Sequence, residues 1–318
     1  MKVAIMCSGG DSSGMNPAIK RFIEYSFELG FKPYLIYDGL EGMIDGNIKK
    51  ADYSDAAGII FRGGTIIGSS RSKRFYEYEY RKKAYENLKN KGIEALMVLG
   101  GNGSFKALDV FSKEFPVLYS GIPATIDNDI ALNEYTLGTD TALNVIRHAC
   151  DEIRDTSSSF RRGSIIETMG RECGYLALVS ALSSGAEICL VPEIEFNLSS
   201  IKKRLIKEFK EGRRYLIAIV AEGVGITHYL KEWLEREIGI ESRATVLGHV
   251  QRGGSPTVFD RLMAYEFVTI GLENLSKGIS GVVVYNNGNF GLKDIDEINA
   301  AKYQIKPMLL KFGERLAN

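Results

Sequence analysis

Short, continuous apolar runs alternate with amphipathic stretches from one end of the chain to the other. Continuous apolar runs are typical of strands buried on both faces, and amphipathic stretches are typical of helices that cover a sheet. The runs predicted to be strands are Val3–Met6, Tyr34–Tyr37, Ala95–Leu99, Pro116–Tyr119, Ser164–Glu167, Ile188–Val191, Leu216–Val220 and Val282–Tyr285. The clearest predicted helices are Pro17–Leu29, Ser199–Glu211 and Tyr229–Ile238. This alternation predicts an α/β fold in which mainly parallel sheets carry helices on both faces.

The length of the chain favours two lobes, because 318 residues are many for one hydrophobic core. No internal repeat, low-complexity segment or linker rich in proline and serine marks a boundary. We therefore expect the lobes to be joined by several chain crossings rather than by one linker.

The composition is that of an ordinary globular protein, with 45% hydrophobic and 25% charged residues. Lys+Arg and Asp+Glu number 40 each, and this balance disfavours a protein that binds nucleic acid or a membrane surface. The four cysteines lack metal-binding or disulfide spacing, so buried free thiols in a reducing cytosol are expected. No apolar run reaches membrane-spanning length and no signal peptide is recognised, so we expect a cytoplasmic protein.

Glycine-rich turns follow several predicted strands, where ligands bind in parallel α/β sheets. These turns are Ser8–Gly14, Arg62–Thr65, Gly100–Ser104, Met169–Arg171 and Glu222–Gly223. Glycine lets backbone N–H groups approach an anion, and a following helix adds partial positive charge, so the first and third turns suit a polyphosphate. A plain connection with positive φ is the alternative for each turn taken singly. The Walker pattern GxxxxGK[ST] and the dinucleotide pattern GxGxxG are both absent, so neither class is indicated.

Two carboxylates, Asp127 and Asp129, lie two residues apart just after an apolar run. In extended backbone, residues i and i+2 face the same way, so both acids are expected to point into one pocket. Acids that share a site need a metal ion, a shared proton or a cation to offset their repulsion. A solvated acidic turn is the alternative interpretation.

Several arginines stand beside glycine, serine or threonine at turns, where their planar forks can bind phosphate through two hydrogen bonds. They are Arg71, Arg162, Arg171, Arg243 and Arg252, and His249 shares the turn of Arg252. Together with the glycine turns and the two acids, this set predicts an enzyme of phosphoryl transfer. In it, Asp129 helps to hold Mg²⁺ and Asp127 accepts the proton of an attacking hydroxyl.

Eight segments in order resemble the bacterial-type ATP-dependent 6-phosphofructokinase family over nearly the whole chain. They are SGGDSSGMN from Ser8, RGGT from Arg62, GGNGS from Gly100, PATIDNDI from Pro123, RDTSSS from Arg154, ETMGREC from Glu167, AEG from Ala221 and RATVLGHVQRGGSP from Arg243. The resemblance implies that the γ-phosphoryl group of MgATP is transferred to the 1-hydroxyl of fructose 6-phosphate, in glycolysis.

The same resemblance implies a role for individual residues. Asp127 is implied as the catalytic base beside Thr125, with Arg71 and Arg171 stabilising charge on the phosphoryl group. The residues implied for the nucleotide are Gly10, Arg71, Ser72, Gly101, Asn102, Gly103 and Ser104, and those for Mg²⁺ are Asp129 and Asn102. The residues implied for the sugar phosphate are Thr125, Asp127, Met169, Gly170, Arg171, Glu222, His249 and Arg252. Arg162 and Arg243 are implied to reach it from a neighbouring subunit of a homotetramer.

The resemblance further implies two Rossmann-like α/β lobes with the active site in the cleft between them. The larger lobe, for ATP and Mg²⁺, is expected to span residues 1–138 and 251–303, and the smaller, for fructose 6-phosphate, 139–250 and 304–318. ATP is favoured over pyrophosphate, because pyrophosphate-using relatives carry Asp and Lys where this chain has Gly103 and Ala124. A carboxylate at position 103 would repel the α-phosphate of ATP.

Three departures from the family pattern change the expectations. Asn102 replaces an aspartate that helps to hold the magnesium of the nucleotide, and it is expected to be a tolerated change. Leu40 and Tyr76 stand on the adenine side where relatives often carry Tyr and Arg, so the nucleotide preference can differ. The effector site implied by the family comprises Lys20, Arg154, Gly185, Glu187 and Arg213. Control by ADP or phosphoenolpyruvate is expected to be weakened, because Glu24 and Asp52 replace basic residues and would repel a phosphate.

Three alternatives stay open from the sequence. One is a non-catalytic subunit that binds sugar phosphate, and another is a pyrophosphate-dependent enzyme. The third is nucleic-acid binding through 71–83, where tyrosines alternate with basic residues; the glutamates in that stretch and the zero net charge disfavour it.

Overall fold

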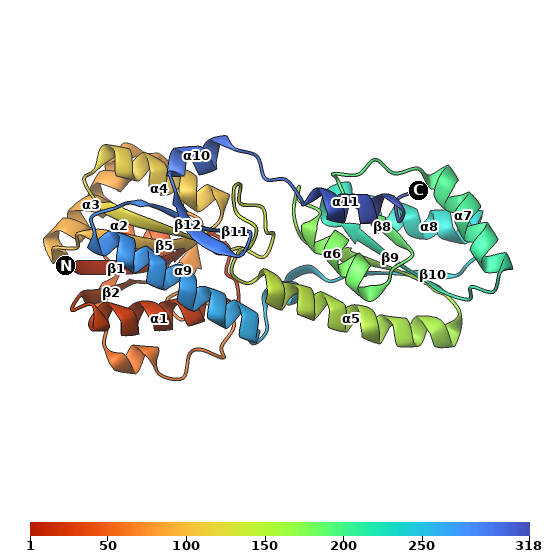
Figure 1. Ribbon diagram of the computed structural model, residues 1–318, viewed down its shortest axis with the longest axis horizontal. Helices are drawn as coiled ribbons and strands as arrows, with labels where there is room; N and C mark the ends of the chain where they lie inside the picture. The colour runs from red at the N-terminus through yellow and green to blue at the C-terminus, as the bar shows by residue number, and fades with distance from the viewer. The chain divides into compact units, whose positions relative to one another are not determined.

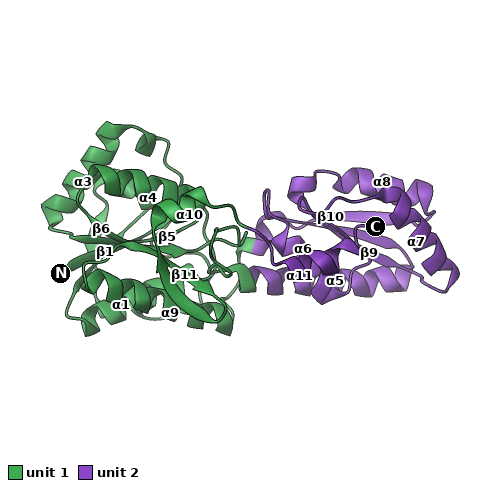
Figure 2. Ribbon diagram, turned by 45° about the horizontal axis from the view of Figure 1, so that its top comes forward, with its two compact units in different colours: residues 1–141, 252–303 green, residues 142–251, 304–318 purple.

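The computed structural model describes residues 1–318, and the chain folds into two compact units (Figure 2). Unit 1 comprises Met1–Thr141 and Arg252–Tyr303, and unit 2 comprises Ala142–Gln251 and Gln304–Asn318. The chain therefore passes from one unit to the other after residues 141, 251 and 303. The boundaries expected from the sequence lay after residues 138, 250 and 303.

Unit 1 is built on a sheet of strand order β12-β11-β6-β5-β1-β2-β3, with β4 paired to β1. The strands are β1 (Lys2–Ser8), β2 (Lys32–Ile36), β3 (Ile48–Lys50), β4 (Ser69–Ser70), β5 (Ala95–Gly100), β6 (Leu118–Pro123), β11 (Gly281–Asn286) and β12 (Asn289–Lys293). Neighbouring strands are parallel except at the edges, where β3 runs against β2 and β12 against β11. This mainly parallel sheet confirms the predicted fold class, and it brings the carboxyl ends of β1, β5 and β6 to one edge.

Helices cover both faces of the sheet of unit 1 (Figure 1). They are α1 (Met15–Glu28), α2 (Gly39–Asp45), α3 (Tyr78–Lys91), α4 (Asn102–Glu114), α9 (Val258–Ser276) and α10 (Ile295–Ala300), with the 3-10 helices η1 (Tyr53–Ala56) and η2 (Arg74–Tyr76). Alternate residues of a strand point to opposite faces, so β1 contributes to two cores. Val3, Ile5 and Cys7 pack with α1 and α9, whereas Ala4 and Met6 pack with α2, α3, α4 and α10.

Unit 2 contains a wholly parallel four-stranded sheet of order β10-β7-β9-β8. Its strands are β7 (Gly163–Thr168), β8 (Ile188–Leu190), β9 (Leu216–Ala221) and β10 (Ser242–Val246). Its helices are α5 (Thr139–Phe160), which begins at the end of unit 1, α6 (Tyr175–Ser184), α7 (Leu198–Lys210), α8 (Thr227–Glu237) and α11 (Pro307–Glu314), with η3 (Glu222–Val224) and η4 (Gly248–Arg252). Apolar residues of α7 and α8, among them Leu205 and Trp233, pack with Ile165 and Val220 of the sheet.

Four strands have no counterpart in the sequence prediction, because they lack a continuous apolar run. β3 reads IKK and β4 consists of two serines. β10 and β12 lie at sheet edges, and most of their side chains are exposed or partly exposed. An edge strand needs apolar residues on one face only, so its sequence does not stand out.

All four cysteines are buried and free, as the sequence predicted. Burial raises the pKa of the Cys7 thiol to about 12, so it stays protonated at neutral pH although it lies in the strand before the first glycine turn. Cys7 therefore acts as a small core residue rather than as a nucleophile.

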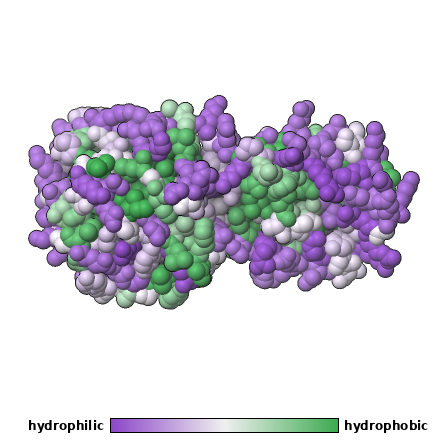
Figure 3. All heavy atoms as spheres, viewed as in Figure 1, coloured by the Kyte–Doolittle hydropathy of each residue, from purple (hydrophilic) through white to green (hydrophobic).

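The outer surface carries mostly polar side chains. In the view of Figure 3, hydrophilic residues occupy most of the visible surface of each unit, and hydrophobic residues gather in smaller patches. None of the helices combines the length and the apolar character needed to cross a bilayer.

Candidate active site

Glycine and serine turns that are far apart in the sequence lie side by side in unit 1. The Gly9 N–H donates to the Ser70 carbonyl at 3.0 Å, and the Ser69 hydroxyl donates to the Gly9 carbonyl at 2.8 Å. The Ser104 hydroxyl donates to the Ser8 carbonyl at 3.0 Å. The turn after β1, the β4 segment and the turn after β5 therefore form one continuous polar rim, as expected for the carboxyl edge of a parallel sheet.

An arginine side chain lies against Gly10 of the first turn. A Cβ added to Gly10 would come within 2.1 Å of Nη2 of Arg252. The guanidinium of Arg252 donates from Nη2 to the Asp11 carbonyl at 2.7 Å and from Nε to the Asp11 carboxylate at 3.2 Å. The structure thus brings Arg252, expected to bind the sugar phosphate, to the turn expected to bind the nucleotide.

The turn after β5 leaves room for a ligand at the start of a helix. α4 begins at Asn102, and its N-cap Gly101 makes no side-chain capping bond. A Cβ added to Gly103 would meet nothing within 4 Å. Unpaired N–H groups at a helix N-terminus favour an anion, so this turn suits a phosphate group. Thr125 lies close by, because a Cβ on Gly101 would be 3.6 Å from the Cβ of Thr125.

The side chain of Asn102 contacts Asp129, the residue expected to hold magnesium. Its Nδ2 donates to the Asp129 carboxylate at 3.0 Å and to the Asp129 carbonyl at 3.1 Å. An aspartate at position 102 could not make these bonds and would instead bring a second negative charge to the same carboxylate. The amide therefore stabilises Asp129 in the absence of any metal.

The two acids flank a residue with a left-handed backbone, and this corrects the extended conformation assumed from the sequence. Asn128 has φ of 51°, and the chain turns here rather than continuing β6, which ends at Pro123. The fully buried Asn128 amide donates to the Glu134 carbonyl at 3.1 Å and to the Tyr303 hydroxyl at 3.2 Å. Its oxygen accepts from the Thr136 N–H at 2.9 Å. Buried hydrogen bonds of the middle residue, not strand alternation, therefore fix the backbone that carries Asp127 and Asp129.

A second buried acid anchors the chain that follows this turn. Asp260 of α9 accepts hydrogen bonds from the Tyr135 hydroxyl and the Gly138 N–H, both at 2.6 Å, and from the N–H of Thr141 at 2.8 Å. Burial raises the pKa of Asp260, and its hydrogen-bond donors offset only part of that rise. Thr136 in the same stretch donates to the Thr125 carbonyl at 2.6 Å. Sequence reasoning missed Asp260 and Asn128, because nothing in their neighbourhood distinguishes them from surface polar residues.

Arg71 and Ser72 follow β4 directly, in a short stretch before η2. The side chain of Arg71 is exposed, and the Ser72 hydroxyl accepts a hydrogen bond from the Phe75 N–H at 3.1 Å. Since β4 pairs with β1, this stretch starts beside the first glycine turn.

In unit 2, the loops after β7 and β9 meet at one carboxylate. Oε1 of Glu222 accepts from the Gly170 N–H at 3.2 Å and from the Arg171 N–H at 2.7 Å. The Met169 N–H donates to the Gln251 side chain at 3.1 Å, which joins η4 to the same loop. A Cβ on Gly170 would come within 2.2 Å of the Cys173 carbonyl. The structure therefore brings Met169, Gly170, Arg171 and Glu222 together, with exposed His249 on η4.

Arg162 and Arg243 lie at the opposite end of the same strands. Arg162 directly precedes β7, and Arg243 is paired in register with Ser164 near the start of that strand. The Arg162 guanidinium stacks on Phe160 with 4.9 Å to the ring centroid, and Arg243 forms an ion pair with Glu241 at 2.6 Å. Residues 162 and 169 are thus about 20 Å apart, since a strand rises about 3.3 Å per residue.

Three residues of the expected effector site, Gly185, Glu187 and Arg213, line a hollow in unit 2. Arg154 donates to the Ser184 carbonyl beside it. Arg213 is ion-paired with Glu187 at 2.5 Å and with Glu208 at 2.8 Å. Lys20 belongs to unit 1, where it pairs with Glu24 at 2.5 Å.

Comparison with known proteins gives a consistent answer over the whole chain. The phosphofructokinase family model matches residues 2–273. An ATP-dependent 6-phosphofructokinase of Sulfurimonas denitrificans is 57% identical over 98% of this chain and 98% of its own, and one of Wolinella succinogenes is 51% identical over 99% of both.

Among solved structures, phosphofructokinase of Saccharomyces cerevisiae superimposes with a TM-score of 0.90 at 30% identity, covering 94% of this chain and 45% of the yeast chain. A pyrophosphate-dependent phosphofructokinase of Marinobacter aquaeolei shares the fold, with a TM-score of 0.85 at 20% identity over 96% of this chain and 85% of its own. By sequence and by fold, the chain belongs to the phosphofructokinase family.

Proposed function

We propose that this chain transfers the γ-phosphoryl group of ATP to the 1-hydroxyl of fructose 6-phosphate in the cytoplasm, giving fructose 1,6-bisphosphate and ADP. The observation that carries the proposal is the proximity of the Gly101–Gly103 turn to Thr125 and, through Asn102, to Asp129. A phosphate-binding turn next to a loop with two acids is what phosphoryl transfer to an alcohol requires.

In this proposal, the residues of unit 1 have different roles in the reaction. Asp127 accepts the proton of the attacking hydroxyl, and its 4% exposure keeps solvent from competing for that role. Arg71, exposed beside the first turn, neutralises charge on the phosphoryl group in transfer. The turn at 101–104 binds the donor phosphates through backbone N–H groups. Unit 2 supplies the residues that bind the acceptor: Met169, Gly170, Arg171, Glu222 and His249.

Asp129 and Asn102 fit a magnesium ion that binds together with the nucleotide. No group of three or more His, Cys, Asp or Glu is arranged to hold a metal by itself. Mg²⁺ in kinases is bound by one or two carboxylates together with phosphate oxygens, and Asp129 with Asn102 offers one carboxylate and one amide. When bound, the ion neutralises charge on the phosphates.

Replacing Asp127 by Asn should abolish proton acceptance while keeping the shape of the side chain. We expect kcat to fall by a factor of about 1,000, with the KM for fructose 6-phosphate changed much less. A coupled assay of ADP release measures both, and Asp296→Asn on the exposed side of α10 is the matched control. If the purified wild type showed no turnover, it would be better explained as a non-catalytic subunit that binds sugar phosphate. If it used pyrophosphate in place of ATP, it would be a pyrophosphate-dependent enzyme.

Replacing Asn102 by Asp should change the metal dependence of the protein. Without Mg²⁺, the variant loses two hydrogen bonds and gains repulsion from Asp129, so its melting temperature should fall. With saturating Mg²⁺, the added charge should lower the KM for MgATP severalfold. Thermal melts with and without Mg²⁺ and steady-state kinetics test this, with Asn90→Asp on α3 as control. Loss of activity at saturating Mg²⁺ would instead show a site built around the amide.

We also propose that the sugar-phosphate site is shared between copies of the chain in a homotetramer. Within one unit 2, Arg162 and Arg243 lie at one end of β7, and Met169 and Glu222 lie beyond the other end of the sheet. The separation of about 20 Å exceeds the length of a hexose phosphate, so one copy cannot supply both sets. A symmetric partner can, because a two-fold interface presents the same patch twice.

Mixing two inactive variants tests the shared site. Asp127→Asn subunits and Arg162→Ala/Arg243→Ala subunits should each be nearly inactive alone. After co-expression with different tags, the mixture should recover about a quarter of wild-type activity, because half of randomly formed pairs are hybrids with one intact site each. A mixture no more active than its parents would mean that each chain holds a complete site, and light scattering reports the assembly size independently.

Effector control is proposed to be weak, because Arg213, one of the residues expected to bind an effector, is already ion-paired. A phosphate entering the hollow must displace Glu187 and Glu208 from Arg213, although Lys311 and Arg315 of the α11 region also line it. On α1, Lys20 is paired with Glu24.

The expected outcome is that ADP or phosphoenolpyruvate shifts the half-saturating concentration of fructose 6-phosphate by less than about twofold, a coupling free energy below about 0.5 kcal/mol. Initial velocities against fructose 6-phosphate, with and without each compound, measure the shift. Glu187→Gln should increase the response by releasing Arg213, and a large shift in the wild type would contradict the proposal.

A further inference from the structure

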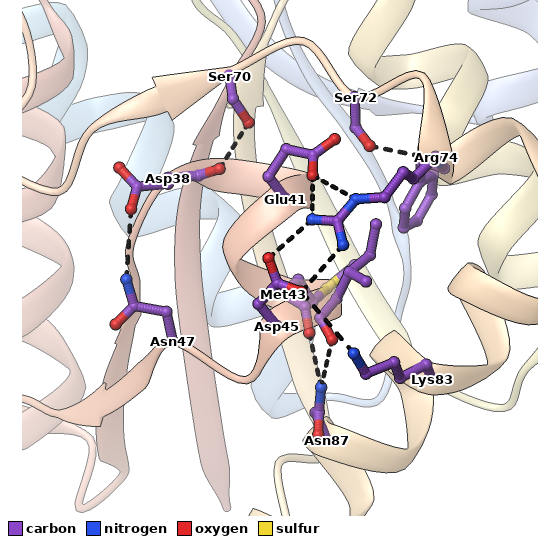
Figure 4. A network of polar contacts seen from close by, with 12 residues as sticks. Asp38, Glu41, Met43, Asp45, Asn47, Ser70, Ser72, Arg74, Lys83 and Asn87 are labelled. Carbon is purple, nitrogen blue, oxygen red and sulfur yellow. Dashed lines mark hydrogen bonds and ion pairs between the residues drawn. The ribbon is translucent and has the colours of Figure 1, made fainter.

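An ion-pair network in unit 1 joins α2, η2 and α3 (Figure 4). None of the residues proposed above to take part in the reaction belongs to it. Its centre is Arg74 of η2, which donates from Nε to the Glu41 carboxylate at 2.7 Å. The same guanidinium donates from Nη1 and Nη2 to the two oxygens of Asp45 at 3.0 and 2.7 Å. Lys83 of α3 approaches Asp45 at 3.8 Å. One arginine fork is therefore held by two carboxylates of α2, in the geometry that gives arginine its strongest ion pairs.

The stretch that this network holds carries Arg71 and Ser72. It lies between β4, which has two residues, and η2, which has three, so regular structure contributes little to its order. Its beginning is fixed by β4, where the Ser70 hydroxyl donates to the Asp38 carbonyl at 2.6 Å. Its end is fixed by buried Phe75, whose carbonyl accepts from Arg81 at 2.9 Å. Arg74, the first residue of η2, ties the end of the stretch to α2 as well.

The electrostatics of α2 agree with this geometry. A hydrogen bond from Ser72 and then those from Arg74 lower the pKa of Glu41, and Arg74 lowers the pKa of Asp45. Both carboxylates are consequently ionised at neutral pH. The interaction stabilises the fold above the usual carboxyl pKa and is lost only as the pH falls through the lowered values. Ser72 lies two residues before Arg74, so the network holds the chain next to one residue expected to bind the nucleotide.

We propose that Arg74 is a positioning residue for the phosphoryl donor, because it anchors the Arg71–Ser72 stretch to Glu41 and Asp45 of α2. This inference rests on the proposed function for the role of Arg71, but the anchoring itself does not. Partly exposed ion pairs contribute little to overall stability, so the effect falls on the position of the stretch rather than on folding.

Steady-state kinetics of Arg74→Gln test the role in binding. We expect the KM for MgATP to rise about fivefold or more, with the KM for fructose 6-phosphate within about twofold of the wild type. Arg74→Lys keeps the positive charge but lacks the planar guanidinium, so its KM for MgATP should lie between those of the wild type and Arg74→Gln. The matched control is Lys113→Gln, since Lys113 also pairs with two carboxylates, Asp109 at 2.8 Å and Asp296 at 2.6 Å. An unchanged KM for MgATP, or an equal rise of both KM values, would overturn the proposal.

Limited proteolysis tests the anchoring without any assay of activity. Glu41→Gln/Asp45→Asn removes both partners of Arg74 and keeps Arg71, Lys73 and Arg74 as trypsin sites. We expect trypsin to cut there several times faster than in the wild type without nucleotide, with little change in melting temperature. An unchanged rate of cleavage would overturn the anchoring. Wild-type protein without turnover would count against the proposed function and leave this result intact.

Discussion

The buried amide of Asn128 is the interaction on which the candidate site depends. It makes three hydrogen bonds inside unit 1 and holds a left-handed backbone that most side chains would disfavour. Because its bonds reach Glu134 and Thr136 in the following loop and Tyr303 far along the chain, the backbone that carries the two acids is held from two sides. A reactive carboxylate held this way loses little freedom when a ligand arrives, which is the physical basis of preorganisation.

Around that turn, polar groups orient other polar groups rather than the ligand. Asp260 holds the start of α5 and the stretch before it, and Asn102 holds Asp129. Each of these acceptors or donors is more effective away from water, where a fully satisfied network is rigid. The region therefore combines a few groups for chemistry with a larger set that keeps them in place.

The sequence predicted the parallel sheets, eight of the strands and the clustering of glycine turns, because buried strands and glycines have strong local signatures. It did not predict β10, whose side chains are mostly exposed, or β4, whose two serines pair with β1 only through tertiary structure. The extended backbone predicted at Asn128 was wrong, because periodicity assumes a regular strand, whereas side-chain hydrogen bonds to the following loop and to Tyr303 decide the backbone there. The ion-pair network of Arg74 could not be predicted from the sequence, because Glu41 and Arg74 are 33 residues apart and meet only in the folded chain.

Gly10 shows how a sequence signature can report two constraints at once. The guanidinium of Arg252 fills the space beside Gly10 where a side chain would lie. Arg252 is the residue at which the chain returns to unit 1 after the unit 2 segment 142–251. A larger residue would have to push the guanidinium, the far end of a flexible side chain, away from the turn. The glycine thus lets the chain that returns from unit 2 make its hydrogen bonds to the first turn, so it contributes to the assembly of a discontinuous domain as well as leaving room for a phosphate.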